Sequence, residues 1–174
     1  MLSEKMVIAL NVQVNVELQS AYQYLAMSAF FESTDLKGCA HWMRIQYQEE
    51  RAHALKIYDF IHDRDGEVTL LPLAAPVTKW DSPTATFAAA LEYERQNSSK
   101  IHDLCDLAMT EKDHASLAFL QWFVNEQVEE EAVAHDLLQK LKMVADSNAG
   151  LFMVDQELAG RPMLPEPDGA DRTI

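Results

Sequence analysis

The chain has 174 residues, of which 48% are hydrophobic and 24% charged, a composition typical of one globular domain and not of a disordered segment. It carries 28 acidic and 14 basic residues, and the formal net charge of −14 disfavours nucleic-acid binding, because an acidic surface repels phosphate and attracts cations. The first residues do not have the pattern expected of a signal peptide, and no apolar stretch reaches the roughly 20 residues that a membrane span needs. Cys39 and Cys105 have neither a metal-binding nor a disulfide spacing, so we expect a cytoplasmic protein with no membrane partner.

Apart from Gly38, glycine and proline gather in two zones, at residues 66–83 and 150–169, and the long intervals without them predict an all-α fold. Ser82 and Pro83 are typical of a helix start, with serine as the N-cap and proline in the first turn. Gly66 is expected to stop the preceding helix. The predicted helices span residues 4–32, 36–64, 83–109, 113–145 and 149–158.

The connection over residues 66–81 is long for a compact domain, and it indicates the architecture. Short turns precede the second and the fourth helix, so the first two helices and the next two are expected to form antiparallel pairs. A four-helix bundle with one long crossover between its second and third helices accounts for this pattern, and the short fifth helix follows it. We expect this domain to cover residues 1–160, with an extended or disordered proline-rich tail over 161–174.

Each of the four long helices carries an apolar stripe with i, i+3, i+4 spacing, and a carboxylate interrupts each stripe near the middle of its helix. Antiparallel helices of similar length align their midpoints, so the four carboxylates are expected to meet at one level inside the bundle. They are Glu17, Glu50, Glu94 and Glu130.

Buried carboxylates of this kind need a counter-charge, because a lone one costs several kcal/mol in apolar surroundings. Only one base on the helices, His53, is in register with them, and no lysine or arginine is. Multivalent cations turn the mutual repulsion into ligation, and a set of carboxylates with one imidazole suits iron or manganese. Glu50 and His53, at i and i+3, form half of the di-iron pattern of helical bundles.

A second set of acidic residues adjoins the first, and two interpretations of it stay open. Glu126, Glu129 and Glu130 stand at i, i+3 and i+4, a spacing at which like charges destabilise a helix. The set is either a solvated acidic face that tolerates this cost or a third metal position, where a cation offsets it. Tyr24, two turns after Glu17, is likewise either a core aromatic or a redox residue. The second set comprises Glu49, Glu126 and Glu129.

Five segments resemble the non-haem bacterial ferritins, and the resemblance covers about residues 1–160. They are NVELQSAYQY at 15–24, QEERAH at 48–53, EYE at 92–94, WFVNEQVEEE at 122–131 and GLFMVDQEL at 150–158. The resemblance implies a ferritin-like bundle and a homo-oligomeric shell of twenty-four subunits. It also implies that each subunit is a ferroxidase, which oxidises Fe²⁺ with O₂, and that the shell stores the Fe³⁺ as a ferric oxyhydroxide mineral.

The same resemblance implies roles for individual residues in an intrasubunit dinuclear ferroxidase centre. Glu17, Glu50 and His53 match the ligands of the first iron, and Glu50 bridges to the second. Gln127 matches a residue near the oxygen-binding position, and Tyr24 a nearby redox participant. The second iron matches Glu50, Glu94 and Glu130, and a third iron matches Glu49, Glu126, Glu129 and Glu130.

Departures from related families narrow the choice. Bacterioferritins bind haem through a methionine just before the histidine of the second helix, and Ala52 stands there, so no haem is expected. Glu126 is not followed by the histidine that completes a second ExxH motif in bacterioferritins and rubrerythrins. The alternative function, a rubrerythrin-like di-iron protein that reduces peroxide, predicts a cysteine-rich electron-delivery segment, which this sequence lacks. A bundle without catalysis is the other alternative.

Overall fold

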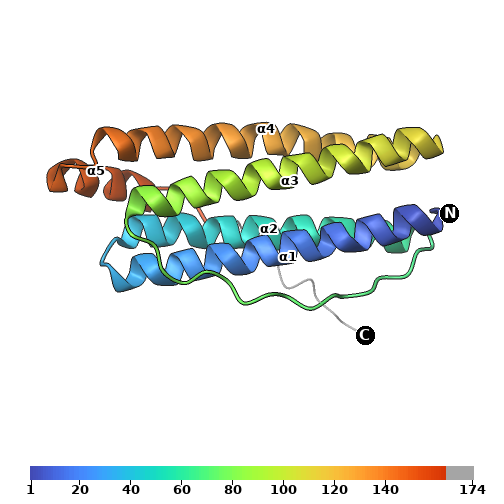
Figure 1. The fold of residues 1–174 in the computed structure, drawn as a ribbon, viewed down its shortest axis with the longest axis horizontal. Coiled ribbons are helices and arrows are strands. Elements are labelled where there is room, and N and C mark those ends of the chain that lie inside the picture. Colours follow the sequence, from blue (N-terminus) through green and yellow to red (C-terminus); the bar gives the residue numbers. More distant parts are fainter. Residues whose placement is uncertain (164–174) are drawn as a thin grey trace.

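A computed structural model describes residues 1–163, and in that part of the chain five α-helices and no strand are formed (Figure 1). The helices are α1 (Glu4–Ser33), α2 (Lys37–Asp63), α3 (Pro83–Glu111), α4 (His114–Met143) and α5 (Asn148–Ala159). The predicted all-α class is confirmed, and every predicted helix is present within two residues of its expected ends. Of the predicted tail, residues 164–174 lie outside the described part. None of the five described helices has both the length and the apolar character that crossing a bilayer requires.

Side-chain caps fix the starts of four of the five described helices, all except α2, as the sequence predicts for Ser82. Its hydroxyl accepts a hydrogen bond from the amide of Ala85 at 3.0 Å, with Pro83 in the first turn. Ser3 and Asp113 cap α1 and α4 in the same way. Each such cap stabilises its helix by about 1 kcal/mol, because it satisfies an amide that has no partner within the helix.

The end of α2 corrects one prediction. Asp65, not Gly66, takes the left-handed conformation there, with φ of 58°. The amide of Gly66 then donates to the carbonyl of Ile61 at 2.8 Å and closes the last turn. Aspartate tolerates this conformation better than most residues, so the left-handed residue after the helix comes one position before the predicted Gly66.

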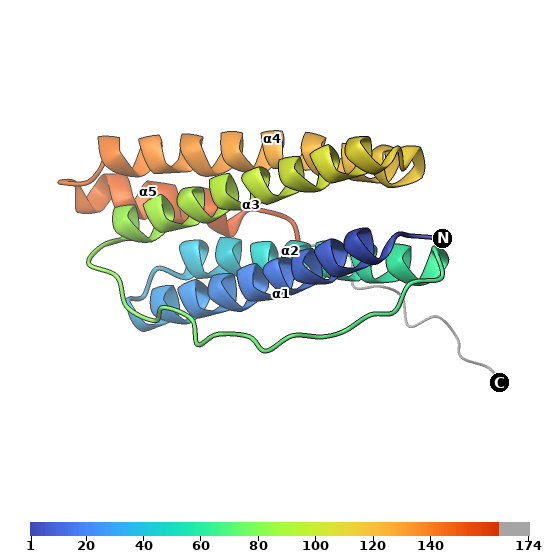
Figure 2. The same cartoon turned by 45° about the vertical axis from the view of Figure 1, so that its right-hand side comes forward.

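The bundle consists of two antiparallel hairpins, α1 with α2 and α3 with α4, laid one on the other (Figures 1 and 2). The predicted long crossover between α2 and α3 runs back along α1, so that α2 and α3 are parallel. Amide side chains of α1 satisfy its extended backbone. Gln19 exchanges two hydrogen bonds with Ala74, and Gln23 exchanges two with Val77. The long connection is thereby fixed to the bundle.

Apolar side chains form two buried clusters, one in each half of the bundle, and each cluster takes members from all four long helices. The residues between the clusters are polar. One cluster includes Met27, Phe31, Met43, Phe87 and Leu137, together with Val154 and Leu158 of α5. The other includes Met6, Leu10, Ile57, Ile61, Ile101, Leu120 and Phe123. The middle of the bundle is thus a polar layer enclosed at both ends by packed hydrocarbon.

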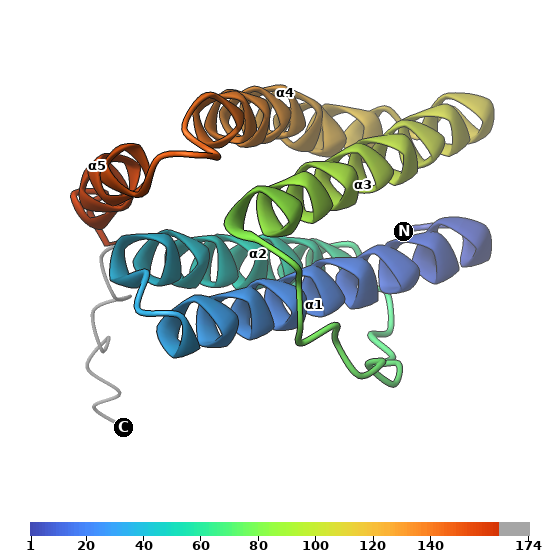
Figure 3. The same cartoon turned by 60° about the vertical axis from the view of Figure 1, so that its left-hand side comes forward.

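Helix α5 packs against the start of α2 at a point where the two backbones nearly touch (Figure 3). A Cβ added to Gly38 would lie 1.7 Å from the carbonyl oxygen of Asp155. The Asp155 carboxylate also accepts a hydrogen bond from the amide of Cys39 at 2.8 Å. Glycine at position 38 therefore allows α5 to dock.

Replacing Gly38 with alanine is expected to displace α5 and to lower the free energy of unfolding by about 1–3 kcal/mol, because the backbones must separate. The melting temperature should fall by roughly 2–4 °C for each kcal/mol, as measured by thermal unfolding. The control is Gly160→Ala, where the new Cβ meets only the Glu157 carbonyl, at 3.3 Å. Equal melting temperatures for the two variants would contradict this account of the α5 contact.

Candidate metal centre

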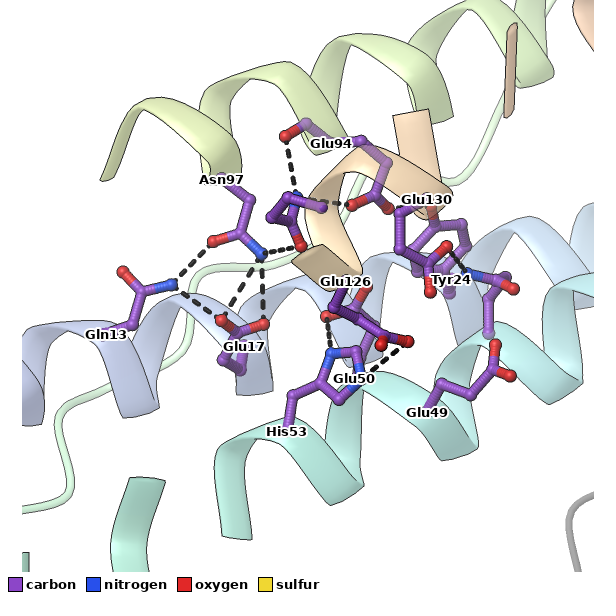
Figure 4. A network of polar contacts seen from close by, with 12 residues as sticks. Gln13, Glu17, Tyr24, Glu49, Glu50, His53, Glu94, Asn97, Glu126 and Glu130 are labelled. Carbon is purple, nitrogen blue, oxygen red and sulfur yellow. Dashed lines mark hydrogen bonds and ion pairs between the residues drawn. The ribbon is translucent and has the colours of Figure 1, made fainter. Parts of the chain in front are cut away.

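The polar layer brings together four buried carboxylates, one from each long helix (Figure 4). Glu17, Glu50 and Glu94 are fully inaccessible to solvent, and Glu130 is 7% exposed. The sequence placed one carboxylate on each apolar stripe, and the structure has all four inside the bundle. Their hydrogen-bond partners differ, and that difference distinguishes one of them from the rest.

Amide groups surround the carboxylate of Glu17. The Nε2 of Gln13 donates to its Oε1 at 2.7 Å, and the Nδ2 of Asn97 donates to its Oε2 at 3.2 Å. Gln13 also donates to the Oδ1 of Asn97, at 2.6 Å, which joins α1 to α3. Donors on both oxygens fix the direction of this carboxylate in the layer.

The carboxylates of Glu94 and Glu130 each have donors as well. The phenol of Tyr24 donates to Glu94 Oε1, and the Nε2 of Gln127 donates to Glu94 Oε2 at 3.3 Å. Glu130 Oε2 accepts from the Nε2 of Gln46 at 2.8 Å. The predicted site residues Tyr24 and Gln127 therefore both contact Glu94, from opposite sides of the bundle.

Glu50 is the exception, since neither of its oxygens has a hydrogen-bond partner among residues 1–163 although both are buried. Ligand atoms of Glu17, Glu50 and His53 lie within 4.8 Å of one another, the geometry of a metal-binding group. The Nδ1 of His53 is 3.8 Å from Glu50 Oε2, too far for a hydrogen bond. An orphaned buried carboxylate is costly, and a cation held between these three groups would satisfy it.

Burial raises the pKa of three of the four carboxyls, those of Glu50, Glu94 and Glu130, and the charges of neighbouring carboxylates raise it further. The pKa of Glu50 lies well above its usual range because the site is dry and because Glu94 and Glu17 repel its charge. Burial raises the pKa of Glu94 to about 7 and that of Glu130 to about 8. The pKa of Tyr24 is raised by the same causes, so its phenol stays neutral and donates. At neutral pH and without a cation, some of these carboxyls are therefore protonated, which reduces the repulsion within the layer.

The metal-free protein is expected to lose stability as the pH rises from about 4.5 to about 8. Between their ordinary pKa of 4.5 and the raised values of about 7 and about 8, Glu94 and Glu130 hold protons in the folded chain that the unfolded chain has released. Their contribution is complete below the unfolded pKa and is lost as the pH passes the folded one. Melting temperatures in chelator at several pH values test this. The exposed-site variant Glu92→Gln should keep the slope, and Glu94→Gln should flatten it. A slope of opposite sign would show that these carboxyls are charged in the metal-free fold.

The second acidic set is not gathered into one group. Both oxygens of the Glu49 carboxylate accept hydrogen bonds from the guanidinium of Arg161, at 2.9 and 2.8 Å. Glu126 Oε1 lies 3.9 Å from His53 Nε2, and Glu129 is exposed. The third metal position expected from these residues stays a prediction.

The sequence reasoning missed two kinds of residue around the centre. Gln13, Gln46 and Asn97 each stand one helical turn from a predicted carboxylate of the same helix, at i±3 or i±4, and that spacing could have indicated them. Arg161 follows α5 and lies on no helical stripe, so periodicity carried no information about it.

Comparison with known proteins assigns the family. The model of the ferritin-like domain family matches residues 8–144. The chain belongs to the ferritin family. This ferritin is 41% identical over 161 residues to a bacterial non-heme ferritin of Bacteroides fragilis, across 92% of this chain and all of the relative. It is 38% identical to one of Staphylococcus saprophyticus, across 92% of this chain and 96% of that relative.

Solved structures agree with the fold. A novel open pore ferritin from the archaeon Archaeoglobus fulgidus matches this ferritin with a TM-score of 0.92 and 48% identity, over 93% of this chain and all of that one. A closed form of the same organism's ferritin, engineered by mutagenesis, matches with a TM-score of 0.93 over 94% of this chain. The predicted ferritin-like architecture and the resemblance to non-haem bacterial ferritins are therefore confirmed.

Proposed function

We propose that the chain is the subunit of an iron-storage ferritin, which oxidises Fe²⁺ with O₂ in the polar layer of its bundle. Membership of the ferritin family supports iron storage. One observation supports the assignment of the site above all. Both oxygens of Glu50 are buried without a hydrogen-bond partner in the described residues, and the ligand atoms of Glu17 and His53 lie close to them. Buried oxygens without donors are the arrangement that a hard cation would satisfy.

In this proposal Fe²⁺ is the substrate, and two ions bind side by side. Glu17, Glu50 and His53 hold one, and Glu94 and Glu130 hold the other, with Glu50 between them. Each ion supplies one electron, so the pair supplies O₂ with two electrons at one place. As the ions bind, the raised-pKa carboxyls release their protons, which converts them into ligands.

The other predicted residues act on these ligands. Gln127 and Tyr24 donate to Glu94 and hold its carboxylate in a fixed direction. The neutral phenol of Tyr24, which donates to Glu94, also takes part in the reaction as a redox residue. The oxidised iron moves to the interior of a shell of twenty-four copies.

Two measurements on the purified protein test the proposal. On gel filtration, the shell should elute far above the 19.7 kDa of one chain. After anaerobic loading with two Fe²⁺ per subunit, adding O₂ should produce Fe³⁺ absorbance much faster than in buffer. A monomer or dimer would contradict the shell, and oxidation at the background rate would contradict the centre.

A further inference from the structure

An arginine from beyond α5 reaches the edge of the polar layer. The Nη2 of Arg161 donates to both oxygens of Glu49, at 2.9 and 2.8 Å, and its Nη1 donates to the Oε1 of Gln46. The guanidinium also lies over the ring of Trp42, 5.1 Å from its centroid. Three groups of α2 therefore hold one side chain in place.

The approach of Arg161 follows from the docking of α5. Gly38 lets α5 lie against α2, and the carbonyl of Arg161 then lies 2.8 Å from the Nε2 of His41. The pair that results is partly buried, with side-chain exposures of 26% for Arg161 and 19% for Glu49. Here one guanidinium nitrogen donates to both carboxylate oxygens, and a partly desolvated pair of this kind is stronger than an exposed ion pair.

The contact with Gln46 links Arg161 to the centre itself. Arginine can only donate, so the Gln46 amide must turn its oxygen toward Arg161 and its Nε2 toward Glu130, where it donates at 2.8 Å. Arg161 is therefore one residue removed from a carboxylate of the proposed dinuclear site.

We propose that Arg161 is the resident cation of Glu49 and competes with a third divalent cation for that carboxylate. Both oxygens of Glu49 are already engaged, so a metal ion can take them only after the guanidinium has moved away. The subunit then holds two cations while Arg161 is in place and accepts a third when it leaves. This inference rests on the proposed function, because it counts cations beyond the dinuclear pair.

The test counts Co²⁺ bound by the metal-free full-length protein, using anaerobic calorimetric titration. Wild type should bind two ions per subunit tightly. Arg161→Gln should bind a third ion, with a dissociation constant at least about tenfold lower than that of any third ion in wild type. The reason is that the two charge-assisted hydrogen bonds between Arg161 and Glu49 need not be broken first. The double variant Glu49→Gln with Arg161→Gln should return to two. Arg64→Gln, which removes an arginine paired with Asp113 at the other end of α2, is the matched control and should bind two.

The outcomes separate this inference from the proposed function. Two ions in wild type and two in Arg161→Gln would overturn the role of Arg161 alone, as would a third tight ion in wild type. A third ion retained in the double variant would show that Glu49 is not its ligand and would also overturn the inference. Wild type without bound Co²⁺ would overturn the proposed centre and this inference with it. Gel filtration and circular dichroism identical to wild type show that each variant is folded.

Discussion

Replacing Glu50 with glutamine is expected to abolish rapid Fe²⁺ oxidation and to raise the melting temperature of the metal-free protein. Glu50 lies between the two proposed ion positions, so its loss affects both at once, and the fast phase should slow by on the order of 100-fold or more, beyond the 10–100-fold typical of residues that only support a ligand. In the metal-free chain the same carboxyl is buried without a partner in the described residues and is repelled by its neighbours. Removing its charge should therefore stabilise the fold, by about 1 kcal/mol at alkaline pH.

Stopped-flow absorbance measures the first effect and thermal unfolding in chelator the second. Glu92→Gln makes the same chemical change on the exposed face of α3, so it controls for net charge and should leave both quantities unchanged. A normal fast phase in Glu50→Gln would remove this residue from the centre. A lower melting temperature would show that its carboxylate makes a stabilising contact, and a purely structural role for Glu50 would produce that result.

The helices could be predicted from the sequence because their signals are local. Proline is absent from the helix interiors and glycine occurs only near helix starts, and the cap at Ser82 with Pro83 fixes one start to the residue. The end of α2 was less predictable, since aspartate and glycine both accept the left-handed conformation and the chain uses Asp65. Which of two adjacent residues takes it depends on how the chain leaves toward the crossover, a tertiary constraint.

The burial of the four carboxylates at one level was predictable for a related reason. The helical period determines which face of a helix a residue occupies, and the antiparallel hairpin determines its level along the bundle. The direction of each carboxylate was not predictable, since it depends on donors from other helices, such as Asn97 of α3 to Glu17 of α1. The helical periodicity could not predict the position of Arg161, because this residue follows the last helix. Its place depends on a docked α5, and that docking depends on the absence of a side chain at Gly38.

Replacing His53 with alanine is expected to reduce the tightly bound cations from two per subunit to one and to slow the fast oxidation phase by on the order of 100-fold. His53 is the only nitrogen ligand in the predicted set, and it belongs to one of the two ion positions. The carboxylates of Glu94 and Glu130 remain for the other ion. One bound ion can supply only one electron, so the paired reduction of O₂ is lost although binding is not.

The variant should stay folded, because the imidazole has no strong protein contact to lose. Its nitrogens lie 3.8 Å from Glu50 and 3.9 Å from Glu126, and its ring meets Trp122 edge to face, with the centroids 5.3 Å apart. Co²⁺ titration and stopped-flow oxidation, with the exposed His102→Ala as control, measure binding and rate separately. If His53→Ala binds two ions but its rapid oxidation phase is slowed, the carboxylates alone bind both ions and the imidazole affects the oxidation step. Two ions with a normal rate would exclude His53 from the centre and leave Glu50 with Glu17 as the only remaining members of the first position.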